Sequence, residues 1–554
     1  CCILAPTASF LFQQKNAPTN NITARINRIE MINKKKPWIK ARWIGVALLL
    51  FATGYLTLNY RILVVGVLYR WAAHDQFNAI WNLVSYASQG LLLFLVIGSI
   101  SGWAFRSVLL LVFISGTVNL VYQSILYDLI NLSTFQWMLA ESRQSLSALK
   151  EFYKDFIWGV TRAGIAVGLF TLTRKAIKYA VFSKMAPHPE NAPILTIVVL
   201  MIFLAADPAL KALGRDRGAE MNVYGMAYQT MTEEIPNRMP ASVKPDFKPS
   251  ANKIIWLIDE SISWRYYDEM FRSEWVSRWG GIDFGEARSL GNCSAQSNAA
   301  LRWGVNVSKL NASTDLRTNS TVWAYAKQAG FRTILMDGQV HGNPQNYLWP
   351  PEKRLIDEVV PMAAGLDSDL KIARRLNGLL KADGRHFAYI VLKGAHYQYF
   401  SNYPDGNLDR SLPIEEQYRK ALRYSKGNFL NELLDGVNMR NVVIFYTSDH
   451  GQHLGNGVIP HCNNKPHPEE LSVPLILFTD PDLRNQFQRN DGEIRSHSQI
   501  FPTTLLLMGY AAEYASREYD NPLPTTSKRI VRFGKRIFPS TNADSIEFFF
   551  DDSN

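Results

Sequence analysis

Residues 441–480, NVVIFYTSDHGQHLGNGVIPHCNNKPHPEELSVPLILFTD, contain the pattern that decides the fold of this chain. The run Val442–Tyr446 is apolar, β-branched and aromatic, which is typical of a buried strand, and Val473–Phe478 is a second such run. Asp449 and His450 directly follow the first strand. Functional side chains collect at the carboxyl ends of strands in open α/β sheets. An oxygen and an imidazole nitrogen at such an end suit zinc; the alternative is a turn cap beside a half-buried histidine.

The preceding part of the chain alternates short apolar runs with amphipathic segments. This alternation predicts an α/β domain that begins at about Lys253, with a mostly parallel sheet and helices on both faces. The predicted strands are Ile254–Ile258, Thr333–Met336 and Phe387–Leu392, and the predicted helices are Thr321–Ala329, Leu366–Lys381 and Ile414–Leu434.

Further reactive side chains stand near other predicted strand ends. Asp259 and Glu260 follow the first strand, where they are either metal ligands or helix caps. Ser294 and Ser297 precede an apolar helical start, and a hydroxyl at a helix N-terminus suits either attack on an anion or simple capping.

Two more predicted strand ends carry candidate reactive side chains. Lys393 and His396 follow the strand that ends at Leu392, and His453 and His461 follow His450. Carboxylates, imidazoles and a hydroxyl that converge from several strands are what metal-assisted phosphoryl or sulfuryl transfer requires.

The first 210 residues have a different composition from the rest. The whole chain is 47% hydrophobic and 19% charged, and its apolar residues crowd into this part. Five stretches are long and apolar enough to be membrane spans. They are Trp43 to about Val65, about Ile80 to Trp103, Ser107 to about Leu126 after a tight turn at Phe105 and Arg106, about Phe156 to Leu172, and Ala192–Ala206.

The net charge of +11 lies largely beside these spans, in Asn33–Arg42 and Arg174–Lys184. This placement indicates a positive-inside topology and argues against a nucleic-acid partner. The N-terminus is then cytoplasmic, and everything after Asp207 is outside. Residues 127–155 are predicted to form amphipathic helices on the outer membrane surface, and residues 1–30 to precede the true start or form a leader, since Met31 stands before the basic run.

The predicted domains are therefore a cytoplasmic segment at 1–42, a five-helix transmembrane domain at 43–210, a connecting segment at 211–252 and a catalytic domain at 253–554. With these features the chain resembles the inner-membrane phosphoethanolamine transferases of the alkaline phosphatase/sulfatase superfamily. That resemblance implies a sulfatase-like α/β/α fold for the outer domain, which would lie in the periplasm.

The resemblance rests on several motifs. The family's Y-T-S-D-H-G block stands at Tyr446–Gly451, and Ile258–Ser261 matches the strand that ends in a metal-binding Glu. The family's Cys-x-x-x-Thr segment is similar to Cys293–Ser297, and its S-H-G-P-x-Y-Y-x-x-Y-P stretch is similar to Ala395–Pro404.

By this resemblance one zinc ion is expected on Glu260, Asp449, His450 and Ser297, with Ser297 as the nucleophile and Ser294 as the alternative. The remaining assignments concern side chains beyond the metal. His396 and His461 would hold phosphate oxygens, bind a second metal or move protons, and Lys393 would add positive charge.

The sequence departs from the family at three points. Its nucleophile would be Ser where Thr is usual, and Lys393 stands where the transferases often carry His. The family's disulfide framework is missing. Cys293 and Cys462 flank the predicted site, and two free thiols are expected there, with a bond between the two as the alternative.

The implied activity is transfer of phosphoethanolamine from phosphatidylethanolamine to lipid A, the lipopolysaccharide core or another envelope glycan, through a covalent serine intermediate. The enzyme would be a monomer in the bacterial inner membrane. One alternative keeps the site but makes the protein a phosphoglycerol transferase or a sulfatase-like hydrolase. True sulfatases set their Cys or Ser in a C/S-x-P-x-R context, and Ser294 and Ser297 lack that Pro and Arg. A second alternative is a non-catalytic membrane assembly protein that binds no zinc.

Overall fold

The computed structural model divides into two compact units. The first comprises residues 1–129, 152–210 and 215–225, and the second comprises residues 130–151, 211–214 and 226–554. Within these units the structure describes residues 37–72, 76–100, 102–126, 130, 135, 138–139, 152–180, 217–232, 235–339, 346–362, 365–455, 460–463, 465–487, 494–534, 536–539 and 546–551.

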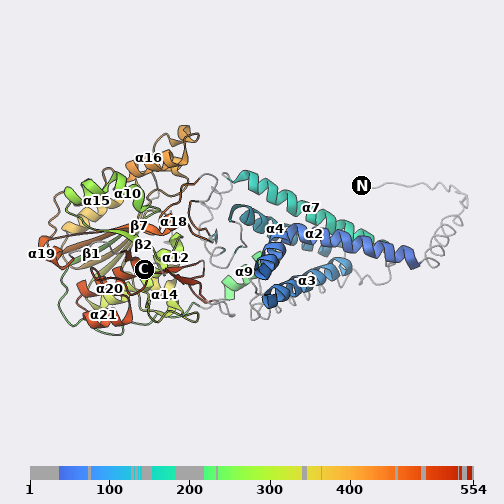
Figure 1. Cartoon of the computed structure of the whole chain (residues 1–554), viewed down its shortest axis with the longest axis horizontal. Helices are drawn as coiled ribbons and strands as arrows, with labels where there is room; N and C mark the ends of the chain where they lie inside the picture. Colours follow the sequence, from blue (N-terminus) through green and yellow to red (C-terminus); the bar gives the residue numbers. More distant parts are fainter. Residues whose placement is uncertain are drawn as a thin grey trace, which may run out of the picture. The chain divides into compact units, whose positions relative to one another are not determined.

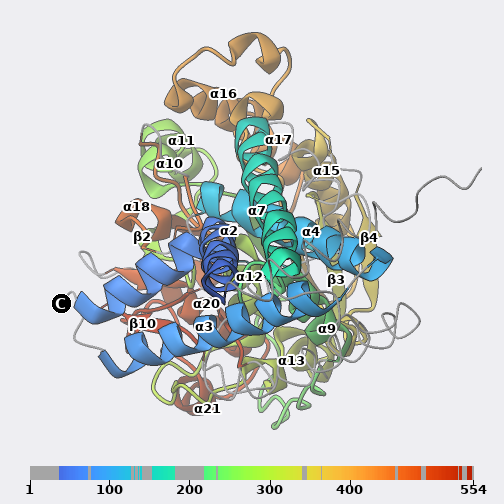
Figure 2. The same ribbon diagram turned by 90° about the vertical axis from the view of Figure 1, so that its right-hand side faces the viewer.

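The described part of the first unit contains four helices that are long and apolar enough to cross a membrane. They are α2 (Pro37–Ala72), α3 (Gln76–Ser99), α4 (Gly102–Leu126) and α7 (Tyr153–Ala180). Helix α2 packs along α7, and α4 also contacts α7 (Figures 1 and 2). Arg162, which interrupts the apolar pattern of the fourth span, donates to the Thr57 carbonyl in α2 at 2.9 Å. This helix-to-helix hydrogen bond satisfies a polar group that is costly to leave unpaired in a membrane.

Four of the five predicted spans are thus helices long and apolar enough to cross a membrane, and the fifth, at 192–206, lies outside the described residues. Most of the predicted surface helices at 127–155 also lie outside them, and α7 begins within that stretch at Tyr153. The predicted turn at Phe105 and Arg106 is wrong, because both residues lie in α4. Helix α4 begins at Gly102, whose φ of 62° costs a glycine little. Helix α9 (Asn222–Thr232) occupies part of the predicted connecting segment.

The second unit is built on an eight-stranded sheet in the order β4-β3-β5-β1-β6-β7-β2-β8. Strand β7 is antiparallel to both of its neighbours and every other pair is parallel, so the prediction of a mostly parallel sheet is confirmed. The strands are β1 (Lys253–Asp259), β2 (Ile282–Arg288), β3 (Arg332–Asp337), β4 (Glu358–Pro361), β5 (His386–Val391), β6 (Val442–Ser448), β7 (Ser472–Thr479) and β8 (Arg495–Ser496), and β9 (Val531–Phe533) pairs separately with β10 (Phe548–Phe550).

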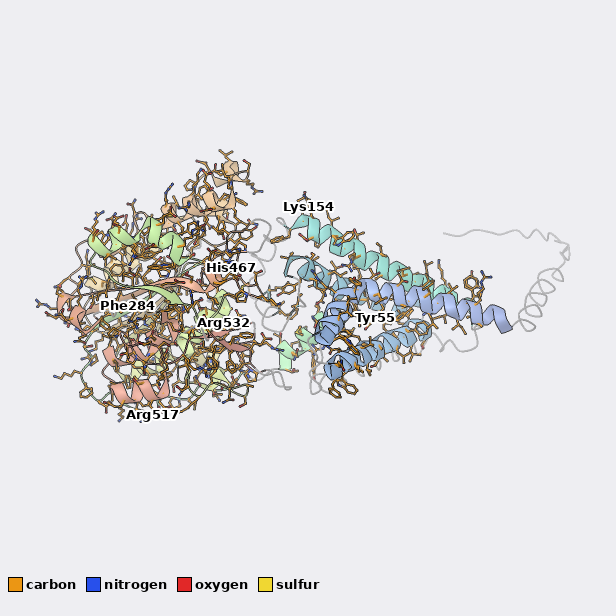
Figure 3. All side chains as sticks on the ribbon, viewed as in Figure 1. Tyr55, Lys154, Phe284, His467, Arg517 and Arg532 are labelled. Carbon is orange, nitrogen blue, oxygen red and sulfur yellow. A yellow bond between two sulfur atoms is a disulfide. The ribbon has the colours of Figure 1, made fainter. Side chains whose placement is uncertain are left out.

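Helices cover both faces of this sheet, as Figure 1 shows for α10 and α15 on one face and α20 and α21 on the other. Alternate residues of β1 contribute to the apolar cores on the two faces of the sheet, because successive strand side chains point to opposite faces. Ile255 and Leu257 join one buried apolar cluster, and Ile254, Trp256 and Ile258 join the other. The sticks of Figure 3 fill the space on both sides of the strands, with Phe284 of β2 fully buried among them.

The first cluster packs against α10 (Trp264–Met270), α11 (Arg272–Ser277), α15 (Ser368–Lys381), α16 (Ile414–Lys426) and α17 (Phe429–Leu434). The second packs against α12 (Ser294–Trp303), α13 (Val322–Gln328), α20 (Ile500–Leu507) and α21 (Ala512–Glu518). The single helix predicted at Ile414–Leu434 is wrong, because Gly427 and Asn428, both weak helix formers, separate α16 from α17. The short helices are η2 (Leu316–Thr318), α14 (Pro350–Lys353), η3 (Tyr399–Asn402), η4 (Gly406–Asp409), α18 (Pro468–Leu471), α19 (Pro481–Arg484), η5 (Asn485–Phe487) and η6 (His497–Gln499).

Candidate active site

Two neighbouring strands bring the predicted ligands together. β1 and β6 are parallel, and Asp259 pairs with Ser448 at their carboxyl ends. The residues that follow, Glu260, Asp449 and His450, are fully buried, and their ligand atoms all lie within 4.8 Å of one another. The structure therefore assembles three of the predicted metal ligands at one point of the sheet edge.

Asp449 and His450 are oriented so that one atom of each faces this point. The Asp449 Oδ1 atom accepts hydrogen bonds from the backbone N–H groups of Ser261 and His450, at 3.1 and 2.8 Å. The other oxygen, Oδ2, is buried and has no hydrogen-bond partner among the residues that the structure describes. The Nδ1 atom of His450 lies 2.9 Å from the Gly451 carbonyl, which places the proton there and leaves the Nε2 lone pair directed at the carboxylates. Nε2 is 3.6 Å from Glu260 Oε1 and 3.7 Å from Asp449 Oδ2.

The hydroxyl that reaches this cluster belongs to Ser294, the first residue of α12. Its Oγ atom lies 3.2 Å from Glu260 Oε2 and 3.2 Å from His450 Nε2. The Ser297 hydroxyl is fully buried and donates instead to the backbone carbonyl of Asp449, at 2.5 Å. The structure therefore brings the alternative serine, and not Ser297, to the three ligands.

The adjacent carboxylates of Asp259 and Glu260 point to different surroundings. Asp259 accepts from Tyr446 at 2.6 Å and pairs with Lys426 at 2.8 Å, which makes it part of a buried ion network. Glu260 instead accepts from Ser261 Oγ at 2.6 Å and from Gln339 Nε2 at 2.7 Å. Gln339 was missed by sequence reasoning; its only signal is its place two residues after the end of β3.

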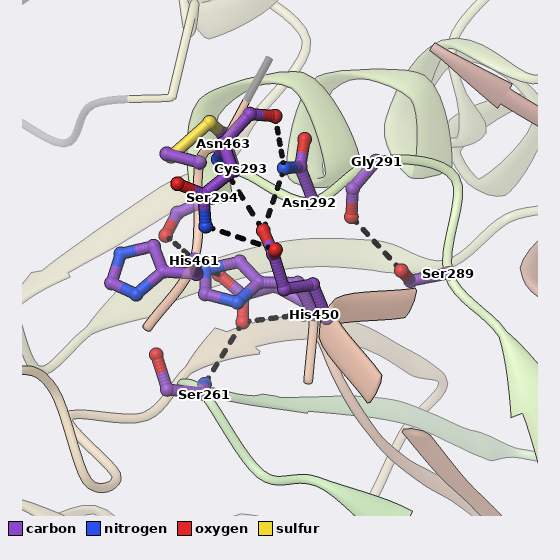
Figure 4. Close-up of a disulfide and its surroundings, with 12 residues drawn as sticks. Ser261, Ser289, Gly291, Asn292, Cys293, Ser294, His450, His461 and Asn463 are labelled. Carbon is purple, nitrogen blue, oxygen red and sulfur yellow. Dashed lines mark hydrogen bonds and ion pairs between the residues drawn. A yellow bond between two sulfur atoms is a disulfide. The ribbon is translucent and has the colours of Figure 1, made fainter. Parts of the chain in front are cut away.

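His396 and His461 lie beside His450. The rings of His450 and His461 are stacked with centroids 4.5 Å apart, and the rings of His461 and His396 meet edge to face at 6.2 Å (Figure 4 shows the stacked pair). His461 Nδ1 is 3.2 Å from Gln452 Oε1. The backbone N–H of Lys393 donates to Asp369 at 2.7 Å, and the positive charge of Lys393 is near enough to help lower the pKa of His396.

The pKa values of these groups follow from burial and mutual charge. Burial, and after it the neighbouring Glu260 carboxylate, raise the pKa of Asp449 to about 7. Burial alone would lower the pKa of His450, but the two carboxylates outweigh it and raise the value. For His461, burial and then the neighbouring histidines hold the pKa well below its usual range. Burial also lowers the pKa of Lys393.

A disulfide joins Cys293 to Cys462, so the expectation of two free thiols is wrong and the alternative is the one observed (Figure 4). The bond spans 169 positions of sequence and links the residue before Ser294 to the residue after His461. The backbone N–H of Cys462 also donates to the Asn292 carbonyl at 2.9 Å. Two parts of the site that are remote in sequence are thus tied together.

The donor set fits a zinc-type ion. Two carboxylates and an imidazole nitrogen, together with the Ser294 oxygen, offer four oxygen and nitrogen ligands, the number that zinc prefers. The unpartnered Asp449 Oδ2 and the like charge of Glu260 are both features that a bound cation would satisfy.

Comparison with known proteins agrees with this geometry. Residues 289–510 match the family model described as sulfatase. Asp449, His450, Ser294 and His461 all lie within the residues that match the sulfatase model, whereas Glu260 precedes them.

Curated relatives confirm the resemblance to phosphoethanolamine transferases. The Kdo(2)-lipid A phosphoethanolamine 7''-transferases of Escherichia coli (strain K12) and Salmonella typhimurium (strain LT2) are each 22% identical, over 37% and 34% of this chain. The chain spans 38% and 39% of their lengths. Among solved structures, the integral membrane lipooligosaccharide phosphoethanolamine transferase A of Neisseria meningitidis matches with a TM-score of 0.55 and 14% identity, covering 85% of this chain and 97% of the other. The fold of helices followed by a sulfatase-like domain is thus shared.

Proposed function

We propose that this chain transfers phosphoethanolamine from phosphatidylethanolamine to lipid A, the lipopolysaccharide core or another envelope glycan, with Ser294 as the nucleophile. The observation that carries the proposal is the Ser294 hydroxyl, 3.2 Å from both the Glu260 carboxylate and the His450 imidazole. The related transferases named above support the choice of transferred group and acceptor. The proposed location is the bacterial inner membrane, with the sulfatase-like domain in the periplasm and the protein acting as a monomer.

The position of Ser294 suits attack on a phosphodiester. It is the first residue of α12, a helix of 10 residues, so the positive end of the helix dipole and its N–H groups favour an anionic phosphate beside it. In the first step the Ser294 oxygen bonds to phosphorus and the bond from phosphorus to the diacylglycerol oxygen breaks. Diacylglycerol leaves with the proton that the Ser294 hydroxyl has lost, and phosphoethanolamine remains bound to the serine oxygen.

The proposed ligands of a zinc-type ion are Glu260, Asp449, His450 and the Ser294 oxygen. Such an ion would lower the pKa of the serine hydroxyl and neutralise charge on the phosphate. Ser261 and Gln339, which donate to Glu260, hold that carboxylate in place for this role.

The second step needs a group that takes a proton from the acceptor hydroxyl. His461 suits this role by its position, because its ring stacks on that of His450 with centroids 4.5 Å apart and an imidazole nitrogen can accept a proton from a hydroxyl. The acceptor oxygen then bonds to phosphorus, the bond from phosphorus to the Ser294 oxygen breaks, and that oxygen takes up the proton from His461, which regenerates the serine hydroxyl. Lys393 and His396 would hold phosphate oxygens, and the contact of the His396 ring with that of His461 supports this role for His396.

The test is mass spectrometry of envelope lipids from cells that express the full chain or its S294A variant. The proposal expects a phosphoethanolamine increment on lipid A or core sugars with the unaltered chain and none with the variant. A phosphoglycerol increment would favour the alternative transferase. Unmodified lipids together with release of free sulfate or phosphate esters would favour a hydrolase and refute the proposal.

A further inference from the structure

A second group of metal-binding side chains lies on the loops that follow β6. His453, His467 and Glu469 each offer a ligand atom, and these atoms lie within 4.8 Å of one another. The His453 Nδ1 atom is 2.8 Å from Glu469 Oε2, and the His467 Nδ1 atom is 3.8 Å from the same oxygen. The two imidazole rings are stacked with centroids 3.8 Å apart. Figure 3 labels His467, which stands just before α18.

Capping of α18 occupies the His467 Nδ1 atom but does not involve the Glu469 carboxylate. His467 Nδ1 accepts a hydrogen bond from the Glu469 N–H at 3.3 Å, so that nitrogen carries a lone pair and not a proton. Glu470, and not Glu469, completes the cap by accepting from the His467 N–H at 2.8 Å. The Glu469 carboxylate is therefore available to a ligand on its Oε2 side, while its other oxygen faces Arg265 at 3.9 Å.

The burial of the group suits an ion that enters from solvent. The side chains of His453, His467 and Glu469 are 28%, 46% and 35% exposed, in contrast to the fully buried ligands at the Ser294 site. Two imidazole nitrogens and one carboxylate oxygen form a donor set that zinc uses in proteins, with a fourth position left for water or an anionic oxygen. Binding would displace the proton that His453 Nδ1 shares with Glu469.

We propose that His453, His467 and Glu469 bind a second divalent ion of the zinc type, separate from the one at Glu260, Asp449 and His450. Binding of this ion would also restrain the chain between His453 and His467. His453 precedes and His467 follows the segment that carries His461 and Cys462. An ion held between His453 and the start of α18 closes this segment into a loop and restrains the part of the chain that presents His461 to the site.

The experiment counts ions on the full chain, purified in detergent, stripped with a chelator and dialysed against buffered Zn²⁺. The unaltered chain is expected to retain two ions, and the H453A and E469Q variants one. E513Q is the matched control, because Glu513 is an exposed glutamate on α21, and it should retain two. The D449N variant, in which the other site is altered, should also lose one ion and should keep the ion that E469Q loses.

Co²⁺ provides a second readout that does not depend on activity. Its visible absorption in the unaltered chain should contain a component that disappears in H453A and persists in D449N. If H467A fails to fold because its helix cap is lost, H453A and E469Q still decide the matter. The proposal is overturned if both retain the ion count and the Co²⁺ spectrum of the unaltered chain. Loss of transfer activity alone bears on the proposed function and not on this site.

Discussion

Replacing Ser294 and Ser297 separately by alanine tests the assignment of the nucleophile. The two hydroxyls stand three positions apart on α12, but only the Ser294 oxygen lies 3.2 Å from both Glu260 and His450. The S294A variant should lose transfer by about 10⁴-fold or more, the scale on which removal of a serine nucleophile acts. It should also form no covalent adduct with the donor.

The S297A variant should act on stability instead. Ser297 is fully buried and donates to the Asp449 carbonyl at 2.5 Å, and removal of such a donor costs about 1–3 kcal/mol. A domain of about 300 residues has an unfolding entropy of about 0.6 kcal/mol per degree, so the midpoint of thermal unfolding should fall by about 2–5 °C. Transfer should continue in the folded fraction, with the covalent adduct still formed.

The assay uses the full chain in detergent with labelled phosphatidylethanolamine. Initial rates report transfer, intact-protein mass spectrometry reports the adduct, and intrinsic fluorescence reports the unfolding midpoint. The reasoning is refuted if S294A retains both transfer and the adduct. It is equally refuted if S297A loses the adduct without any change in its unfolding midpoint.

Three further predictions concern the surroundings of the site. Replacing Cys293 and Cys462 by serine opens a loop of 169 positions, so denaturant unfolding should show a loss of up to about 5 kcal/mol; an unchanged midpoint would contradict the bond. The Q339A variant should weaken zinc binding by about 10–100-fold in chelator competition, because Gln339 orients Glu260. Burial holds the pKa of His497 at about 3, so protonation of the unfolded chain lowers stability by about 1.4 kcal/mol per unit as pH falls from 6.5 towards 3. H497Q should reduce that slope by the same amount, and an unaltered slope would count against this origin.

The strands at the centre of the sheet were predictable because burial on both faces leaves a continuous apolar run. Strands β1, β5 and β6 lie side by side there, and every residue of each is buried. Strand β2 was missed because its sequence, IDFGEAR, lacks such a run and it lies near the edge, between β7 and the two-residue β8. Gly285, with a φ of 79°, and the register shift between Asp283 and Glu286 further break its pattern.

The structure turns Ser294 and not Ser297 towards the three ligands, because a spacing in sequence does not fix where a helix begins. The family resemblance set the hydroxyl four positions after Cys293, at Ser297. The structure starts α12 at Ser294, and a residue three positions further along a helix lies about 4.5 Å deeper along its axis. At that depth the Ser297 hydroxyl meets the backbone of Asp449 and cannot face the ligands. The disulfide and Gln339 are contacts across long sequence separations, for which the sequence has no local signal.

Asp259 and Glu260 are adjacent carboxylates with different partners, which the sequence alone does not distinguish. Asp259 is the last residue of β1 and Glu260 follows it, and the two carboxylates point to different surroundings. Asp259 lies on the face of the buried Lys426, whose charge it pairs at 2.8 Å, and Glu260 lies on the face of Ser294 and His450. Exchanging these roles would leave the Lys426 charge without one of its two carboxylate partners in the core. The buried lysine on α16 is therefore as important as the sequence motif in leaving Glu260, and not Asp259, as the proposed metal ligand.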